Sequence, residues 1–172
     1  IYSPSNFKEL ENDLKAAVYT DNGPVVIRYP RGTQKAADII PDYKSDAYSI
    51  YGDINNSRNV ILTYGRITAS AAVAAQKAES TSVIALNVIK PVCSEIFEIT
   101  GNAGRILFLE EGIRTGGVGE KVALELLERG YKGEYKLVSV EDEFVAQASV
   151  SSQLERYGLD ENSIIKILSE EN

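Results

Sequence analysis

The stretch Arg105-Ile106-Leu107-Phe108-Leu109-Glu110 is an unbroken apolar run bounded by two charged residues. Four consecutive apolar residues predict a strand that is buried on both faces, as in a parallel sheet. A loop rich in glycine follows, and residues 117–129 then carry apolar side chains at helical spacing. This strand–loop–helix unit indicates an α/β fold.

The same alternation continues on both sides of that stretch. We expect further strands at residues 48–53, 60–64, 82–88 and 135–140, and further helices at 68–79, 94–100, 151–157 and 161–169. Strands that alternate with helices predict a mostly parallel sheet covered on both sides. The predicted fold of residues 47–172 is therefore a three-layer αβα sandwich with a mostly parallel five-stranded sheet.

The first 32 residues form a separate pattern. Residues 6–19 predict a helix that Ser5 could cap, with its apolar residues on one face: Phe7, Leu10, Leu14, Ala17 and Val18. A turn at 21–24 and a strand at 25–28 follow. Such a strand–helix–strand piece is too small to fold alone and is typical of the end of a larger α/β domain. Residues 33–46 are polar and predict a linker with little regular structure.

Composition excludes several classes of function. The net charge of −7 disfavours binding to nucleic acid or to an anionic membrane. The chain contains no histidine, so histidine catalysis and histidine metal ligation are excluded within it. The single cysteine, Cys93, fits a reducing cytoplasm and is expected to be inert. The chain begins with isoleucine and lacks methionine, so we expect it to be part of a longer polypeptide.

The stretch Arg28-Tyr29-Pro30-Arg31-Gly32 is the candidate binding site. Pro30 favours an extended backbone before it, which places Tyr29 and Arg31 on one side and Arg28 on the other. An arginine fork suits a phosphate group, so a phosphate clamp for a small substrate is one interpretation. The alternative is a strand end whose arginines pair with nearby carboxylates.

The loop from Glu110 to Gly119 is a second candidate. A dinucleotide fingerprint needs glycines at its first, third and sixth positions, but Val122 stands at the sixth after Gly117 and Gly119. The carboxylates of Glu110 and Glu111 would also repel a pyrophosphate. We therefore expect close packing of the helix against the sheet, with both glutamates in surface or interface hydrogen bonds.

Taken in order, these pieces resemble the C-terminal part of the 1-deoxy-D-xylulose-5-phosphate synthases, thiamine-diphosphate enzymes of the transketolase superfamily. The resemblance extends over essentially the whole chain, and the Arg-Tyr-Pro-Arg-Gly stretch is its most specific piece. The matching pieces are Ser3-Pro4-Ser5, Asp21-Asn22-Gly23-Pro24, Ile27-Arg28-Tyr29-Pro30-Arg31-Gly32, Tyr64-Gly65, Val88-Ile89-Lys90-Pro91, Glu110-Glu111, Gly116-Gly117-Val118-Gly119 and Tyr157-Gly158-Leu159-Asp160.

The resemblance implies a division of the chain and a role for each part. Residues 1–32 would end the pyrimidine-binding domain, 33–46 would be a linker, and 47–172 would be the transketolase C-terminal domain. The whole enzyme would be a homodimer that condenses pyruvate with glyceraldehyde 3-phosphate, releases carbon dioxide, and serves isoprenoid, thiamine and pyridoxal synthesis. Arg31 would contact the substrate phosphate, with Tyr29 beside it.

The resemblance also implies what this chain lacks. The Gly-Asp-Gly…Asn motif that holds thiamine diphosphate and magnesium belongs to earlier domains of the family, as do the catalytic histidines. The chain would therefore hold no catalytic, cofactor-binding or metal-binding residue and would be inactive alone. Three other interpretations stay open: the C-terminal domain of another transketolase-like or keto-acid dehydrogenase beta-type protein, a free-standing Rossmann-like nucleotide-binding module, or an interaction domain.

Overall fold

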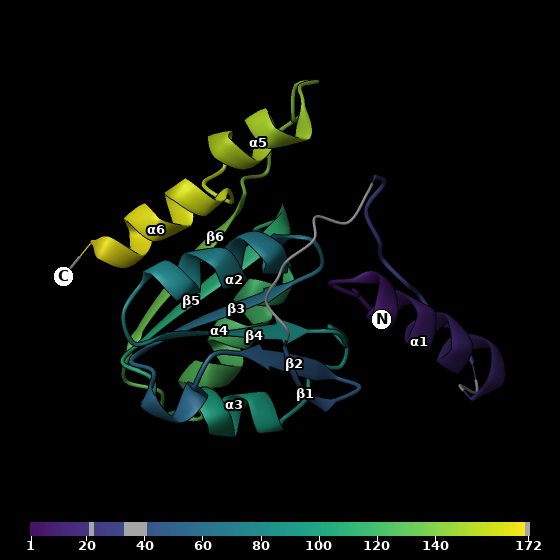
Figure 1. Ribbon diagram of the computed structural model, residues 1–172, viewed down its shortest axis with the longest axis horizontal. Helices are drawn as coiled ribbons and strands as arrows, with labels where there is room; N and C mark the ends of the chain where they lie inside the picture. Colours follow the sequence, from purple (N-terminus) through teal and green to yellow (C-terminus); the bar gives the residue numbers. More distant parts are fainter. Residues whose placement is uncertain (21–22, 33–40, 171–172) are drawn as a thin grey trace.

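A single mixed sheet forms the centre of the protein. The computed structural model describes residues 1–20, 23–32 and 41–170. Within them the sheet has six strands in the order β1-β2-β4-β3-β5-β6 (Figure 1). The strands β4, β3, β5 and β6 run parallel, whereas β2 is antiparallel to β4 and β1 is antiparallel to β2. The strands are β1 (Asp42–Ser45), β2 (Tyr48–Tyr51), β3 (Asn59–Tyr64), β4 (Thr81–Leu86), β5 (Arg105–Ile113) and β6 (Glu134–Val140).

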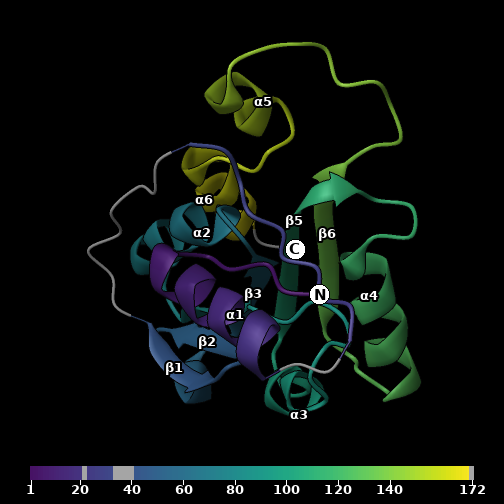
Figure 2. The same cartoon turned by 90° about the vertical axis from the view of Figure 1, so that its right-hand side faces the viewer.

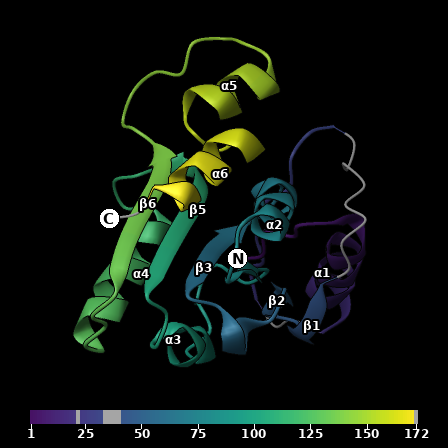
Figure 3. The same ribbon diagram turned by 60° about the vertical axis from the view of Figure 1, so that its left-hand side comes forward.

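Helices cover both faces of this sheet, so the predicted three-layer αβα fold is confirmed. The helices α3 and α4 pack on one face and α2 and α6 on the other. Figure 3 shows α4 behind β5 and β6, with α6 in front of them. The helices are α1 (Phe7–Tyr19), α2 (Ile67–Lys77), α3 (Glu95–Thr100), α4 (Val118–Glu128), α5 (Val150–Arg156) and α6 (Glu161–Ser169), with a short 3-10 helix at Ile54–Asn56.

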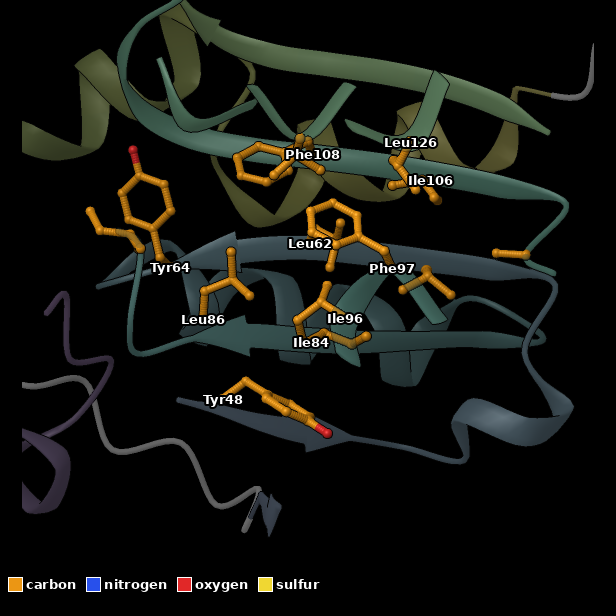
Figure 4. Close-up of a cluster of buried hydrophobic side chains, with 14 of the residues drawn as sticks. Tyr48, Leu62, Tyr64, Ile84, Leu86, Ile96, Phe97, Ile106, Phe108 and Leu126 are labelled. Carbon is orange, nitrogen blue, oxygen red and sulfur yellow. The ribbon is translucent and has the colours of Figure 1, made fainter. Parts of the chain in front are cut away.

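The two faces of the sheet build two apolar clusters, because neighbouring residues of a strand point to opposite sides. In β5, Ile106 and Phe108 enter the cluster with α3 and α4, whereas Leu107 and Leu109 enter the one with α2 and α6. All four side chains are buried. Figure 4 shows the first cluster, with labelled side chains from β2 to β5 and from α3 and α4. The unbroken apolar run therefore follows from burial on both faces.

Two predictions about the chain before the sheet need correction. Residues 42–45, which were predicted to belong to an irregular linker, form the edge strand β1, a sixth strand in addition to the five predicted. The rest of that predicted linker, 33–40, lies outside the described residues. The predicted strand at 25–28 is reduced to a single bridge between Ile27 and Tyr2. Both differences have the same cause, since a strand requires a pairing partner as well as a suitable sequence.

The N-terminal segment docks against the sheet through polar groups. Asn6, rather than Ser5, caps α1 by accepting a hydrogen bond from the Glu9 amide. Figure 2 shows α1 (purple) in front of the sheet, between α2 and α3. Glu9 and Asp13 face inward and are buried, while the apolar residues Leu14 and Val18 are exposed.

No helix among the described residues is long and apolar enough to cross a membrane.

Helix α4 approaches the sheet closely at Gly119. A methyl group at this position would lie 2.4 Å from Leu137 Cδ1 and 3.0 Å from Phe108 Cδ1. Both neighbours belong to strands under the helix, so the predicted close packing of the glycine loop and helix on the sheet is confirmed.

The substitution Gly119→Ala should lower the free energy of unfolding by about 1–3 kcal/mol, because the added carbon overpacks the helix–sheet contact. Gly112→Ala is a matched control, since its methyl group would meet Tyr64 Oη at an ordinary 3.5 Å. Urea unfolding of both variants measures the difference. Equal losses at the two positions would contradict the close-packing account.

Candidate functional site

The sheet has a topological switch point at the carboxyl end of β3. The chain passes from β3 to β4 on one side and then returns to place β5 on the other side. Ligands of open α/β sheets bind in the crevice at such a point. Tyr64, the last residue of β3, and Glu110, near the carboxyl end of β5, lie there.

Glu110 is fully buried at this point and accepts three hydrogen bonds. The Tyr64 hydroxyl donates to Oε2 at 2.9 Å, the Val118 amide to Oε2 at 3.0 Å, and the Gly119 amide to Oε1 at 3.3 Å. Burial raises the pKa of the Glu110 carboxyl, and these donors oppose that rise because they favour the charged form. Burial likewise raises the pKa of Tyr64 to about 12.

The position of Glu110 differs from the predicted one. It was expected in a surface or interface hydrogen bond, but its side chain fills the place where helix α4 begins. The N-terminus of a helix normally attracts an anion. Here the protein's own carboxyl group accepts from the amides of Val118 and Gly119, and a methyl group on Gly117 would lie only 2.4 Å from Glu110 Oε1. A ligand phosphate therefore has no room at this helix.

Glu111 does lie near the surface, as predicted, and pairs with Arg66, the residue just before α2. Arg66 donates to Glu111 from Nε at 2.7 Å and also from Nη2. Both side chains are about one-third exposed, with 29% for Arg66 and 35% for Glu111. The pair joins the start of α2 to the end of β5 and leaves Glu111 committed to a protein contact.

The N-terminal segment runs across the same edge of the sheet. The Ser3 carbonyl accepts a hydrogen bond from the Gly65 amide at 3.2 Å, and the Ser3 amide donates to the Asn87 carbonyl at 2.7 Å. Tyr2 bridges Val88 on one side and Ile27 on the other. The segment is thus hydrogen-bonded to Gly65 and Asn87, the residues just past the carboxyl ends of β3 and β4.

The structure separates the two arginines of the candidate stretch. The Arg28 guanidinium carbon lies 5.5 Å from the centre of the Tyr64 ring, within the range of a cation–π contact. Its positive charge also opposes the rise in the pKa of Glu110. Tyr29 is 66% exposed, and Arg31 is exposed without an ion pair to any residue that the structure describes.

An open groove of about 630 Å³ lies beside Arg28. Its floor is apolar, with Phe97 and Val122, and Lys90 and Lys121 stand on its rim. Arg31 is not among the residues that line the groove. Cys93 packs partly buried against the adjacent core cluster.

Sequence reasoning did not identify the contact between Tyr64 and Glu110. The two residues are 46 positions apart, and only the pairing of β3 with β5 brings them together. The sequence does place a tyrosine and a glutamate at the carboxyl ends of two predicted strands. Their contact could be predicted only if those strands were known to be neighbours in the sheet.

Comparison with known proteins finds one matching family model and several curated relatives. Residues 53–164 match the family model described as the C-terminal domain of transketolase. The chain is 30% identical to the 1-deoxy-D-xylulose-5-phosphate synthase of Bacteroides fragilis and 31% identical to that of Clostridium beijerinckii, each over 98% of this chain. It spans only 27% and 28% of the length of these curated relatives.

A solved structure gives the same fold. The chain of a protein titled split gene transketolase, inactive beta4 tetramer, superposes with a TM-score of 0.75 at 24% sequence identity. The match covers 97% of this chain and 55% of the other. The likeness therefore includes the N-terminal segment as well as the sheet.

The substitution Glu110→Ala should lower the free energy of unfolding by about 2–4 kcal/mol, because it leaves the Tyr64 hydroxyl and two helix amides without an acceptor. Glu111→Gln is the control, and it should cost less than about 1 kcal/mol because its ion pair is partly exposed. Urea unfolding compares the two. Similar small losses would mean that the Glu110 contacts contribute little.

Proposed function

The chain belongs to the family of transketolase C-terminal domains, and we propose that it is the C-terminal part of a thiamine-diphosphate-dependent transferase of the 1-deoxy-D-xylulose-5-phosphate synthase type. The observation that carries the proposal is the alignment with synthases of that name over 98% of the chain, well beyond the 53–164 of the family model. The reaction would join pyruvate and glyceraldehyde 3-phosphate into 1-deoxy-D-xylulose 5-phosphate and carbon dioxide.

The outward face of α1 supports the proposal that residues 1–32 belong to a larger pyrimidine-binding domain. Leu14 is 49% exposed and Val18 is 70% exposed, while Glu9 and Asp13 on the opposite face are buried. An apolar stripe turned away from the domain it rests on is expected where another layer packs on the helix. The missing layer would be the sheet of that pyrimidine-binding domain.

Arg31 and Tyr29 are the proposed substrate contacts. Both are exposed at the end of the 25–32 segment, and Arg31 forms no ion pair among the described residues. Arg28 is turned to the Tyr64 ring and fixes the segment on the domain. The arrangement leaves the Arg31 fork available for a phosphate group supplied by the aldehyde substrate.

Thiamine diphosphate and magnesium do not fit the residues that the structure describes. Among the described residues no group of three or more His, Cys, Asp or Glu side chains could hold a metal ion. The amides at the start of α4 already bind Glu110. We therefore assign the cofactor and its metal to other parts of the full-length enzyme, and no catalytic step to the residues described above.

The free-standing nucleotide-binding module is the less favoured alternative. The switch-point crevice holds Glu110 and Tyr64, and the N-terminal segment crosses it. A different transketolase-like or keto-acid dehydrogenase beta-type enzyme would share the fold, but the named relatives favour the synthase. A homodimer, a cytoplasmic location and a role in oligomer packing stay predictions.

In the full-length enzyme, Arg31→Ala should lower kcat/KM for glyceraldehyde 3-phosphate about ten- to a hundredfold. Loss of one charge-assisted hydrogen bond costs roughly 1.5–3 kcal/mol. Steady-state kinetics with unphosphorylated glyceraldehyde supply the control, because that substrate should lose almost nothing. An equal loss with both aldehydes, or none with either, would remove Arg31 from phosphate binding.

The 172-residue chain alone should form no 1-deoxy-D-xylulose 5-phosphate from the two substrates with thiamine diphosphate and magnesium present. The reason is that the residues assigned to cofactor binding and proton transfer lie outside it. A coupled assay with the full-length enzyme as positive control measures this. Product formation above background would refute the proposal that the residues for cofactor binding and proton transfer lie outside this chain.

A further inference from the structure

Two carboxyl groups on the inner face of α1 are buried against the rest of the protein. Glu9 and Asp13 lie one helical turn apart and are only 6% and 3% exposed. Glu9 is well supplied with donors, since it accepts from the Ser5 amide at 2.7 Å and from the Ser49 hydroxyl at 3.4 Å. Acidic side chains are rarely buried to this extent without compensating partners.

Asp13 meets Asn87, the residue that follows β4. The Asn87 side-chain nitrogen donates one hydrogen bond to Asp13 Oδ1 at 2.8 Å and another to the Asp46 carbonyl at 3.0 Å. Both hydrogens of the amide are then in use. Asp13 Oδ2 and Asn87 Oδ1 remain buried, and neither has a hydrogen-bond partner.

A single proton would satisfy both of these oxygens. A carboxylate only accepts hydrogen bonds, whereas a protonated carboxyl group also donates one. With a proton on Oδ2, Asp13 can donate to Asn87 Oδ1 while Oδ1 continues to accept from Asn87. Such a pair would have two antiparallel hydrogen bonds between the carboxyl group and the amide. Without the proton, the same contact buries two unpaired acceptors, which is costly.

We propose that Asp13 and Asn87 form a proton-operated latch, in which an acid–amide pair holds α1 on the sheet when Asp13 is protonated and loosens when it ionises. The latch joins the N-terminal segment to the end of β4, next to the edge that the segment covers. It therefore controls how firmly residues 1–32 sit on the domain.

The surrounding charges act in the same direction. The described charged groups that act on Asp13 are the carboxylates of Glu9, on the same helix, and of Asp46, in the turn between β1 and β2. Burial above all, together with these two charges, raises the pKa of Asp13 to about 6. Burial also raises the pKa of Glu9. Neither carboxyl group has a described cation to offset the burial.

The sign of the pH dependence follows from that raised pKa. The docked helix binds the Asp13 proton more tightly than the released helix, where the pKa is near its ordinary value of 3.8. Docking is therefore strongest below about pH 4 and weakens as the pH rises to about 6, above which it is constant. A difference of about two pKa units corresponds to roughly a hundredfold change in the docking equilibrium.

Hydrogen exchange of the 172-residue chain tests the latch. Protection factors of the α1 amides, corrected for intrinsic exchange at each pH, should fall roughly a hundredfold between pH 4 and pH 7.5. Asp13→Asn carries a neutral amide that can make the same two hydrogen bonds, so its α1 protection should be higher at pH 7.5 and should fall much less with pH than that of the wild type, the remaining fall coming from Glu9. Glu11→Gln removes an exposed carboxylate from the same helix and should keep the wild-type profile.

Three results would overturn the proposal. The first is a flat wild-type profile, and the second is an Asp13→Asn profile that falls as steeply with pH as the wild-type profile. The third is recovery of α1 protection at pH 7.5 on addition of sodium, potassium or calcium chloride, which would mean that a cation occupies the gap. Amides of β3 and β5 report whether each variant is folded. If Asp13→Asn does not fold, NMR titration of the Asp13 carboxyl carbon in the wild type decides, and a pKa near 4 contradicts the latch.

Discussion

The buried carboxyl group of Glu110 is the contact on which the arrangement of the site depends. It receives hydrogen bonds from the end of β3 and from the first two residues of α4. Tyr64 in turn supports Arg28, which comes from the N-terminal segment. Three parts of the chain that are distant in sequence thus meet around one acidic side chain. In other open α/β sheets a ligand binds in this crevice, whereas here the side chains of Tyr64 and Glu110 occupy it.

The N-terminal segment combines firm main-chain contacts with an unusual distribution of side chains. Its backbone forms hydrogen bonds with Gly65, Asn87 and Ile89, and the carboxyl groups of Glu9 and Asp13 face inward. The apolar residues of α1 face outward instead. Polar contacts between units are typical of interfaces that can change, whereas apolar ones are typical of permanent cores. The segment thus has one adjustable face and one face suited to permanent packing.

Sequence patterns predicted the sheet and its helical layers because burial on both faces leaves unbroken apolar runs such as 106–109. They did not predict β1, since Asp42–Ser45 is polar and becomes a strand only by pairing with β2. The run at 25–28 has the composition of a strand, but it forms only one β-bridge, between Ile27 and Tyr2. Glutamate is usually exposed, so the burial of Glu110 could not be read from its neighbours; it depends on a tyrosine 46 positions earlier. The role of Arg31 rests on the resemblance and stays a prediction.

The closeness of the two parts of the chain in sequence has a consequence for how they associate. The docked segment ends at Gly32, and the first strand of the sheet, β1, begins at Asp42, ten positions later. Docking is therefore intramolecular, at an effective concentration on the order of millimolar. Contacts too weak to hold two separate polypeptides together are sufficient under this condition, so the segment can be released and recaptured without leaving the protein.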